Sequence, residues 1–125
     1  MSGVKMIVLV WIFICVILAV LGQIFMKLGT KDVGGITVKK LASKEIFSIL
    51  FNKYIFPGLV FYAVGWFLWL VVLSQAELSF AYPFLALSYA IIAVISWLFL
   101  GETMSLLKAA GILFIMLGAI LLNLK

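Results

Sequence analysis

The sequence has no histidine, and Cys15 is the single cysteine among its 125 residues. A disulfide framework needs pairs of cysteines, and a zinc site needs several cysteine or histidine ligands. Nucleophilic catalysis by a cysteine needs a base such as histidine beside it. The composition therefore excludes all three, and we expect neither a metal nor a cofactor.

Charged residues are also scarce, at 10% of the chain, and only 4 residues are acidic. No pair of carboxylates, no nucleophile–base set and no glycine-rich phosphate loop is present, so nothing in the sequence indicates an enzyme. The net charge of +5 comes entirely from lysines. They cluster beside apolar runs, which favours an anionic membrane surface over nucleic acid as their partner.

Apolar residues make up 68% of the chain, more than a soluble domain of this size can bury. Four apolar runs are long enough to cross a bilayer, since a helix of about 20 residues spans its hydrocarbon core. They cover approximately residues 6–27, 55–73, 80–100 and 106–124. We therefore predict an all-α integral membrane protein that forms a single domain of four transmembrane helices.

One long polar segment, residues 29–53, separates the first two spans. Within it, residues 41–51 mix polar and apolar side chains, as a short helix lying in the membrane interface would. An early start of the second span is the alternative interpretation of the same residues.

The distribution of lysines predicts the topology. With four spans, both termini lie on one side of the membrane, together with Lys5 and Lys125. The other side carries the long loop and the remaining seven lysines, which are Lys27, Lys31, Lys39, Lys40, Lys44, Lys53 and Lys108. Because cytoplasmic loops are enriched in lysine, we expect loop 29–53 in the cytoplasm and both termini facing outward across the inner (plasma) membrane.

The third apolar run carries a polar stripe. Tyr82, Tyr89 and Ser96 are spaced seven residues apart, so a helix presents all three on one face. Polar groups inside hydrocarbon are costly unless they face protein, water or a substrate. We therefore interpret this face as the wall of a helix interface or of a substrate pathway.

The second run carries an aromatic face formed by Tyr62, Trp66 and Trp69 at helical spacing. Tryptophan and tyrosine are enriched where a span meets the interface, which accounts for Trp69 and Tyr62. Trp66 should lie near the middle of the bilayer. It is expected either to line a cavity or to fill space between helices, and the sequence does not decide between these roles.

The last run has Gly111 and Gly118 on one face. Small residues let two helix backbones approach closely, so this face is the natural seam of a dimer. Glycine is frequent in transmembrane helices in general, and two glycines alone are a weak signal.

Several short motifs follow one another along most of the chain. They are GQIFMK at residues 22–27, LWLVVL at 68–73, AYPFLAL at 81–87 and LGE at 100–102. In their order and spacing, the chain resembles the four-span members of the drug/metabolite transporter superfamily, which are EamA-like. The nearest resemblance is to subunits of the bacterial flippase for an undecaprenyl-phosphate-linked aminoarabinose, and the last span also resembles the dimer helix of small multidrug resistance transporters.

Two departures separate these branches. Small multidrug resistance transporters exchange protons for cationic drugs through a glutamate in their first span, and this chain has Ala19 at that position. They also carry a tryptophan where this chain has Leu85. Without a buried carboxylate, the first span has no group that trades a proton for a cation. The resemblance thus implies a polyprenyl-phosphate-linked sugar or a related amphipathic anion as substrate. A drug or cation exporter and an accessory subunit of a membrane glycosyltransferase or carrier are the alternatives.

Gln23 and Lys27 are the candidate substrate ligands of the first span. Gln23 lies one helical turn before Lys27, so the two share a face. Its amide is suited to hydrogen bonds with a sugar or phosphate oxygen, or with another helix. Lys27 is expected either to attract a lipid phosphate or simply to extend its ammonium to the interface. Glu102 is expected to cap or salt-link the turn before the last span, with Lys108 as its candidate partner.

Four spans supply only one of the two repeats between which transporters build their path. A dimer is therefore expected. The uneven distribution of lysines disfavours a chain that inserts in both orientations, so we predict either a partner chain of opposite orientation or a parallel homodimer.

Overall fold

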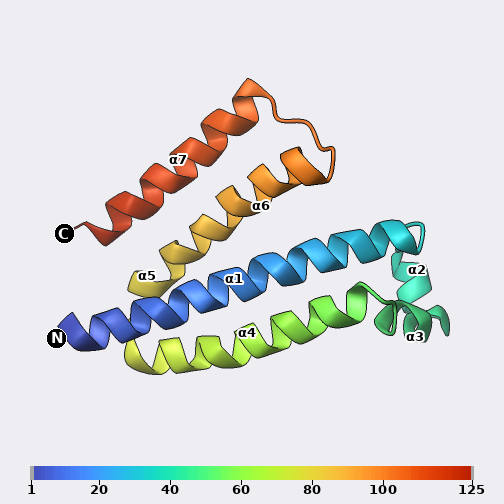
Figure 1. The fold of residues 1–125 in the computed structure, drawn as a ribbon, viewed down its shortest axis with the longest axis horizontal. Helices are drawn as coiled ribbons and strands as arrows, with labels where there is room; N and C mark the ends of the chain where they lie inside the picture. The colour runs from blue at the N-terminus through green and yellow to red at the C-terminus, as the bar shows by residue number, and fades with distance from the viewer. Residues whose placement is uncertain (1, 125) are drawn as a thin grey trace.

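The computed structural model describes residues 2–124, apart from the side chains of residues 2–5, and its regular structure is helical throughout that range. The long helices are α1 (Ser2–Asp32), α4 (Ile55–Gln75), α6 (Ala86–Phe99) and α7 (Leu106–Asn123). The short elements are α2 (Val38–Leu41), α3 (Glu45–Leu50), α5 (Leu78–Ala81) and the 3-10 turn η1 (Tyr82–Leu85). In Figure 1, α1 lies between α4 on one side and α6 on the other, while α7 stands outermost.

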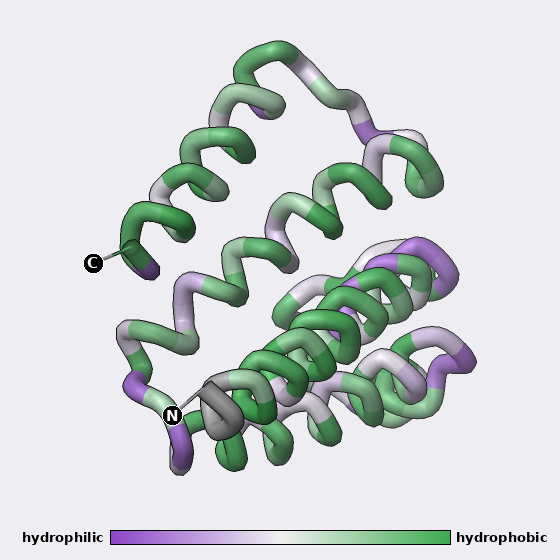
Figure 2. The backbone as a smooth tube through the Cα atoms, turned by 60° about the vertical axis from the view of Figure 1, so that its left-hand side comes forward, coloured by the Kyte–Doolittle hydropathy of each residue, from purple (hydrophilic) through white to green (hydrophobic). Residues whose placement is uncertain are grey.

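Four of these segments are long and apolar enough to cross a membrane: Met6–Asp32, Ile55–Gln75, Leu78–Phe99 and Leu106–Asn123. Apolar residues dominate the long helices, whereas hydrophilic residues gather in the loops and at helix ends (Figure 2). Many large apolar side chains are exposed, including Phe114 at 73% and Leu107 at 87%. Such exposure is favourable in lipid, and the chain is a multi-pass membrane protein, as predicted.

Helices α1 and α4 form the most closely packed pair, because glycines let their backbones approach. A Cβ atom added at Gly22 would lie 2.7 Å from the Tyr62 ring and 3.0 Å from the carbonyl oxygen of Gly58. A Cβ atom at Gly58 would lie 3.0 Å from the carbonyl oxygen of Gly22 and 3.1 Å from the Met26 backbone nitrogen. In lipid, where burial gains no hydrophobic free energy, this close contact is what holds two helices together.

A row of buried residues on α1 forms the centre of the core. Its members repeat at steps of four or close to it: Val8, Ile12, Val16 and Val20. They pack in one cluster with Val72 of α4 and Ala81 of α5, and partly buried side chains of η1 and α6 complete it. The ring of Phe84 meets Phe13 of α1 edge to face, with centroids 6.4 Å apart. The third span thus docks against α1.

The third span is broken near its start, whereas the sequence analysis expected one helix over residues 80–100. The chain forms α5, then the 3-10 turn η1 from Tyr82, and becomes α-helical again only at Ala86. Pro83 explains the break, since proline has no backbone N–H to donate to the residue four before it. The tighter 3-10 turn changes the direction in which the side chains that follow it point.

The first span continues past residue 27 and ends at Asp32. The segment expected as one interfacial helix over residues 41–51 instead forms two shorter helices, α2 and α3. Asn52 joins this region to the bundle: its Nδ2 donates to Asp32 (2.9 Å), and its Oδ1 accepts from the N–H of Tyr54 (2.9 Å). We call the end of the bundle that carries α2, α3 and the α6–α7 turn the loop end, and the opposite end the terminal end.

Helix α7 is the least buried of the four spans, and none of its residues is buried. A Cβ atom added at Gly111 or Gly118 would meet nothing within 4 Å. The structure therefore leaves both glycines of the predicted dimer seam uncovered. The sequence analysis assigned Lys5 and Lys125 to the terminal end. Lys125 and the side chain of Lys5 both lie outside the described part of the chain.

Candidate functional site

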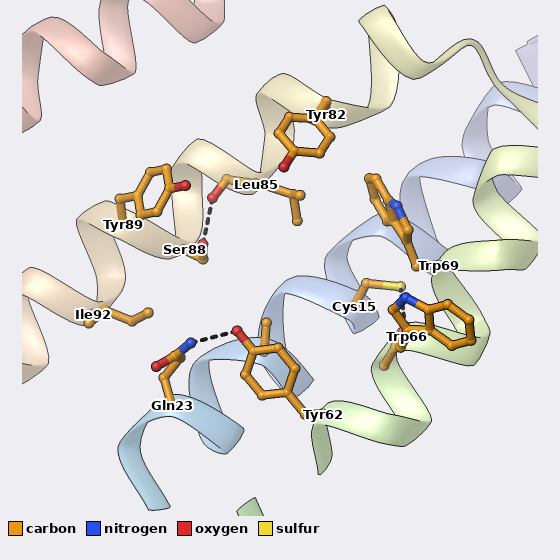
Figure 3. A pocket seen from close by; sticks show the side chains of 12 residues that line it. Cys15, Gln23, Tyr62, Trp66, Trp69, Tyr82, Leu85, Ser88, Tyr89 and Ile92 are labelled. Carbon is orange, nitrogen blue, oxygen red and sulfur yellow. Dashed lines mark hydrogen bonds between the residues drawn. The ribbon is translucent and has the colours of Figure 1, made fainter. Parts of the chain in front are cut away.

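A cavity of about 400 Å³ lies between α1, α4 and the broken third span. Figure 3 shows side chains from these elements converging on it, with Trp66 and Trp69 on one side and Tyr82 and Tyr89 on the other. The remaining lining residues come from all three spans and are Cys15, Ala19, Gln23, Tyr62, Gly65, Leu85, Ser88 and Ile92. We call this space the central cavity.

Hydrogen bonds fix several polar groups in its wall. Gln23 Nε2 donates to the Tyr62 hydroxyl at 2.5 Å, which links α1 to α4 across the cavity floor (Figure 3). The Tyr62 hydroxyl keeps its own proton free to donate to a bound molecule. The Ser88 hydroxyl donates to the Leu85 carbonyl at 2.5 Å, at the junction of η1 and α6. This second bond satisfies a carbonyl next to the helix break.

Aromatic side chains form the accessible part of the wall. Trp66, Tyr82 and Tyr89 are 58%, 57% and 59% exposed, so more than half of the surface of each residue is available to a ligand or to lipid. Trp69 and Tyr82 meet edge to face with centroids 6.3 Å apart, which joins α4 to η1 at the terminal end of the cavity. Such rings provide flat apolar surface together with hydroxyl and indole donors.

The described lining of the central cavity contains no charged side chain. Its ligands would be hydroxyl, amide and indole groups on an apolar frame. This chemistry fits an uncharged polar group such as a sugar and offers no carboxylate to a drug cation or to a transported proton.

A second cavity, of about 320 Å³, lies between α6, α7 and the turn that joins them. It shares Tyr89 and Ile92 with the central cavity, so the two spaces adjoin across one wall. Ser96 also lines it, as do the charged residues Glu102 and Lys108. We call it the turn cavity.

The candidate ligands from the sequence fall in three places. Gln23, Trp66, Tyr82 and Tyr89 line the central cavity, whereas Ser96 lines the turn cavity. Lys27 lines neither: it is exposed, one turn beyond Gln23 toward the loop end. Gly111 and Gly118 lie apart from both cavities, on α7.

One expected contact is wrong. Glu102 and Lys108 do not form an ion pair. Lys108 Nζ instead donates to the Thr103 carbonyl oxygen at 3.0 Å. The short turn places this carbonyl nearer to the lysine than the glutamate side chain. The cap of α7 is instead Ser105, whose hydroxyl accepts from the Lys108 N–H at 3.1 Å.

Sequence reasoning missed Ser88 and Ile92 as lining residues. Ile92 lies three residues after Tyr89, and Ser88 lies four residues before Ile92, so helical spacing links both to the tyrosine stripe. Extending the tyrosine stripe to these neighbours on the helix would have found them. The sequence contains no signal for the second cavity, because that cavity exists only through the separation of α7 from α6.

Four apolar spans, three of which line an uncharged, partly polar cavity, define a small multi-pass membrane protein. The chain belongs to the EamA-like transporter family, whose match covers residues 36–124. The family resemblance drawn from its motifs is thereby confirmed. No solved structure matches the chain.

Named relatives match the chain over most of its length. One is the probable 4-amino-4-deoxy-L-arabinose-phosphoundecaprenol flippase subunit ArnF of Proteus mirabilis strain HI4320, 30% identical over 122 residues that cover 92% of this chain and 90% of that protein. The protein of the same description from Serratia proteamaculans strain 568 is 31% identical over 123 residues, covering 90% of this chain and 89% of its own.

Proposed function

We propose that this chain is one subunit of a flippase that moves a sugar linked to a polyprenyl phosphate across the inner membrane. The observation that carries the proposal is the uncharged central cavity, lined by hydroxyl, amide and indole groups within four apolar spans. The description of its relatives as flippase subunits for an aminoarabinose-phosphoundecaprenol supports the same class of cargo.

For such a flippase, the sugar is the part of the cargo that is costly to move through the hydrocarbon of the membrane. A hydroxyl group moved from water into hydrocarbon without a hydrogen-bond partner costs roughly 2–7 kcal/mol, and a sugar has several. Tyr62, Tyr82 and Tyr89 offer hydroxyl partners along the cavity, while Trp66 and Trp69 offer flat surfaces for the sugar ring. The polyprenyl chain needs no such help and stays in the lipid.

The phosphate requires a positive charge, which the central cavity lacks. Gln23, Lys27 and Lys31 follow one another at four-residue steps on α1, toward the loop end. We assign Lys27 to the phosphate, because a lysine at the membrane interface attracts it as a compact charge while Gln23 reaches the sugar side. In this proposal the loop end is cytoplasmic and the termini face outward.

The partner of this subunit completes the path. The chain supplies one repeat, and transporter sites lie between two. Helix α7 has no buried residue, and the uncovered Gly111 and Gly118 permit a second helix to approach closely. We propose this face as the seam with a second four-span chain.

The two alternative functions receive less support. A proton-coupled drug or cation exporter needs an acidic group in the membrane-spanning part of its path, and the described lining of the central cavity has none; Glu102 lines only the turn cavity at the loop end. An accessory subunit with no cargo of its own has no need for a cavity of about 400 Å³ lined by polar groups.

Native mass spectrometry tests the proposal. The chain is purified in mild detergent from bacterial membranes that contain a polyprenyl-phosphate-linked aminopentose. We expect this lipid to co-purify, and we expect Lys27→Ala to weaken its binding roughly tenfold, as loss of a charge-assisted hydrogen bond does. Lys39→Ala, which removes an exposed lysine of α2, is the matched control and should retain the lipid. Absence of bound lipid, with Lys27→Ala no different from Lys39→Ala, contradicts the assignment.

A further inference from the structure

The turn that closes the second cavity is held rigidly from two sides. The Glu102 N–H donates to the Ser96 carbonyl at 3.1 Å, and the Leu100 N–H donates to the same oxygen at 3.2 Å. Gly101 between them has a φ of +73°, a conformation that favours glycine. From α1, Lys31 Nζ donates to the Leu100 carbonyl at 3.3 Å. These bonds fix where the backbone of Glu102 lies relative to α1 and α6.

Both signs of charge line the turn cavity without neutralising each other. Lys108 Nζ is bound to the Thr103 carbonyl, and the Glu102 carboxylate has no ion-pair partner among the described side chains. The hydroxyl groups of Tyr89 and Ser96 lie in the same wall. A carboxylate accepts hydrogen bonds only, whereas an ammonium donates only. The cavity therefore presents a strong acceptor and a strong donor to the same molecule.

We propose that the turn cavity is a second binding site, which takes a polar group bearing a primary ammonium, with Glu102 as the residue that selects for it. This inference rests on the proposed function and assigns to Glu102 the recognition of the amino group that the described cargo of the relatives carries. The ammonium donates to the Glu102 carboxylate, and the anionic part of the headgroup faces Lys108. An isolated cation fits less well, because the lysine repels it.

The shared wall gives this site a place in the transport path. Tyr89 and Ile92 border both cavities, so a headgroup held at Glu102 lies next to the central cavity. The turn cavity is at the loop end and carries charge, whereas the central cavity is uncharged. The headgroup is first selected for its ammonium at the turn and then passes Tyr89 into the central cavity, where the faces of Trp66 and Trp69 take over the ammonium from Glu102.

A pair of probes that differ only at the amino group tests this inference. One probe is a short polyprenyl phosphate linked to an aminopentose, and the other is the same lipid with its amine acetylated. Their competition for the full-length chain in detergent is followed by native mass spectrometry. We expect the wild type to prefer the free amine about tenfold or more, because only the free amine is charged.

Glu102→Gln should abolish this preference and leave binding of the acetylated probe within about twofold of wild type. Glu77→Gln removes the glutamate that precedes the third span, at the terminal end and in neither cavity, and should keep the preference. The inference fails if Glu102→Gln retains the preference. It also fails if Glu102→Gln weakens the binding of both probes by the same factor, which is the result expected of a purely structural role. Equal binding of both probes by the wild type overturns this inference alone, whereas binding of neither overturns the proposed function as well.

Discussion

At the scale of single residues, Tyr89 occupies the most informative position, because it borders both cavities. Its ring is 59% exposed, so it contributes little to packing within the chain. Its neighbour across the central cavity, Tyr62, already accepts a hydrogen bond from Gln23. The hydroxyl of Tyr89 has no partner of this kind among the described residues and is the freer of the two to bind cargo.

Replacing Tyr89 with phenylalanine should impair transport of the lipid-linked sugar by roughly threefold to tenfold, the effect of losing one hydrogen bond. The ring is kept, so the thermal unfolding of the protein should not change. Initial transport rates and melting temperatures check the two halves of this prediction. Tyr54→Phe, at the start of α4 and in neither cavity, is the control. An unchanged rate would assign the tyrosine stripe to helix packing.

At the residue scale, the sequence could predict only what helical periodicity carries. The seven-residue spacing placed Tyr82, Tyr89 and Ser96 on one face, and two cavities do lie along that face. Periodicity could not reveal that the face divides between the two spaces, since that depends on the separation of α6 from α7. It also could not foresee that Lys108 would bind the Thr103 carbonyl rather than Glu102.

At the scale of secondary-structure elements, the α1–α4 pair is the rigid part of the structure. Gly22 and Gly58 face each other, and the atoms nearest to an added Cβ include backbone atoms, which cannot move aside cheaply. Seven of the twelve residues that line the central cavity lie on this pair, among them Cys15, Gln23 and Tyr62. Its packing therefore determines the geometry of one cavity wall.

Gly58→Ala should lower the free energy of unfolding by about 1–3 kcal/mol, because the new methyl group would lie 3.0 Å from the Gly22 carbonyl oxygen. Gly111→Ala is the matched control, since nothing lies within 4 Å of its added Cβ. It should leave the monomer as stable or stabilise it by up to about 1 kcal/mol through helix propensity. Chemical unfolding in a detergent that keeps the chain monomeric measures both. Equal stabilities of the two variants would contradict the account of this interface.

Composition alone predicted the number of spans, because only helices of about 20 apolar residues cross a bilayer. It did not predict the arrangement of the helices, since almost any apolar surface is acceptable in lipid. The break at η1 had a visible cause in Pro83, yet proline near the start of a span is often tolerated without a break. The continuation of α1 to Asp32 was hidden because lysines interrupt its last turns.

At the scale of the whole molecule, the outermost of the four spans is left uncovered. Helix α7 buries none of its residues, and its apolar surface is available to lipid or to a second chain. The relatives are described as flippase subunits, which supports our proposal that this chain works with a partner subunit. The distribution of lysines predicts how each chain is oriented, but the sequence holds no information on its partner.

Translocation by the purified assembly, reconstituted in liposomes, tests the central claim most directly. A polyprenyl phosphate carrying an aminopentose is placed in both leaflets, and the amine in the outer leaflet is labelled by a reagent that does not cross the membrane. We predict that the protein lets labelling proceed beyond the outer half of the lipid, and that Gln23→Leu slows this second phase. Labelling that stops at half with the protein present, as in empty liposomes, would contradict the claim that the chain belongs to a lipid-linked sugar flippase.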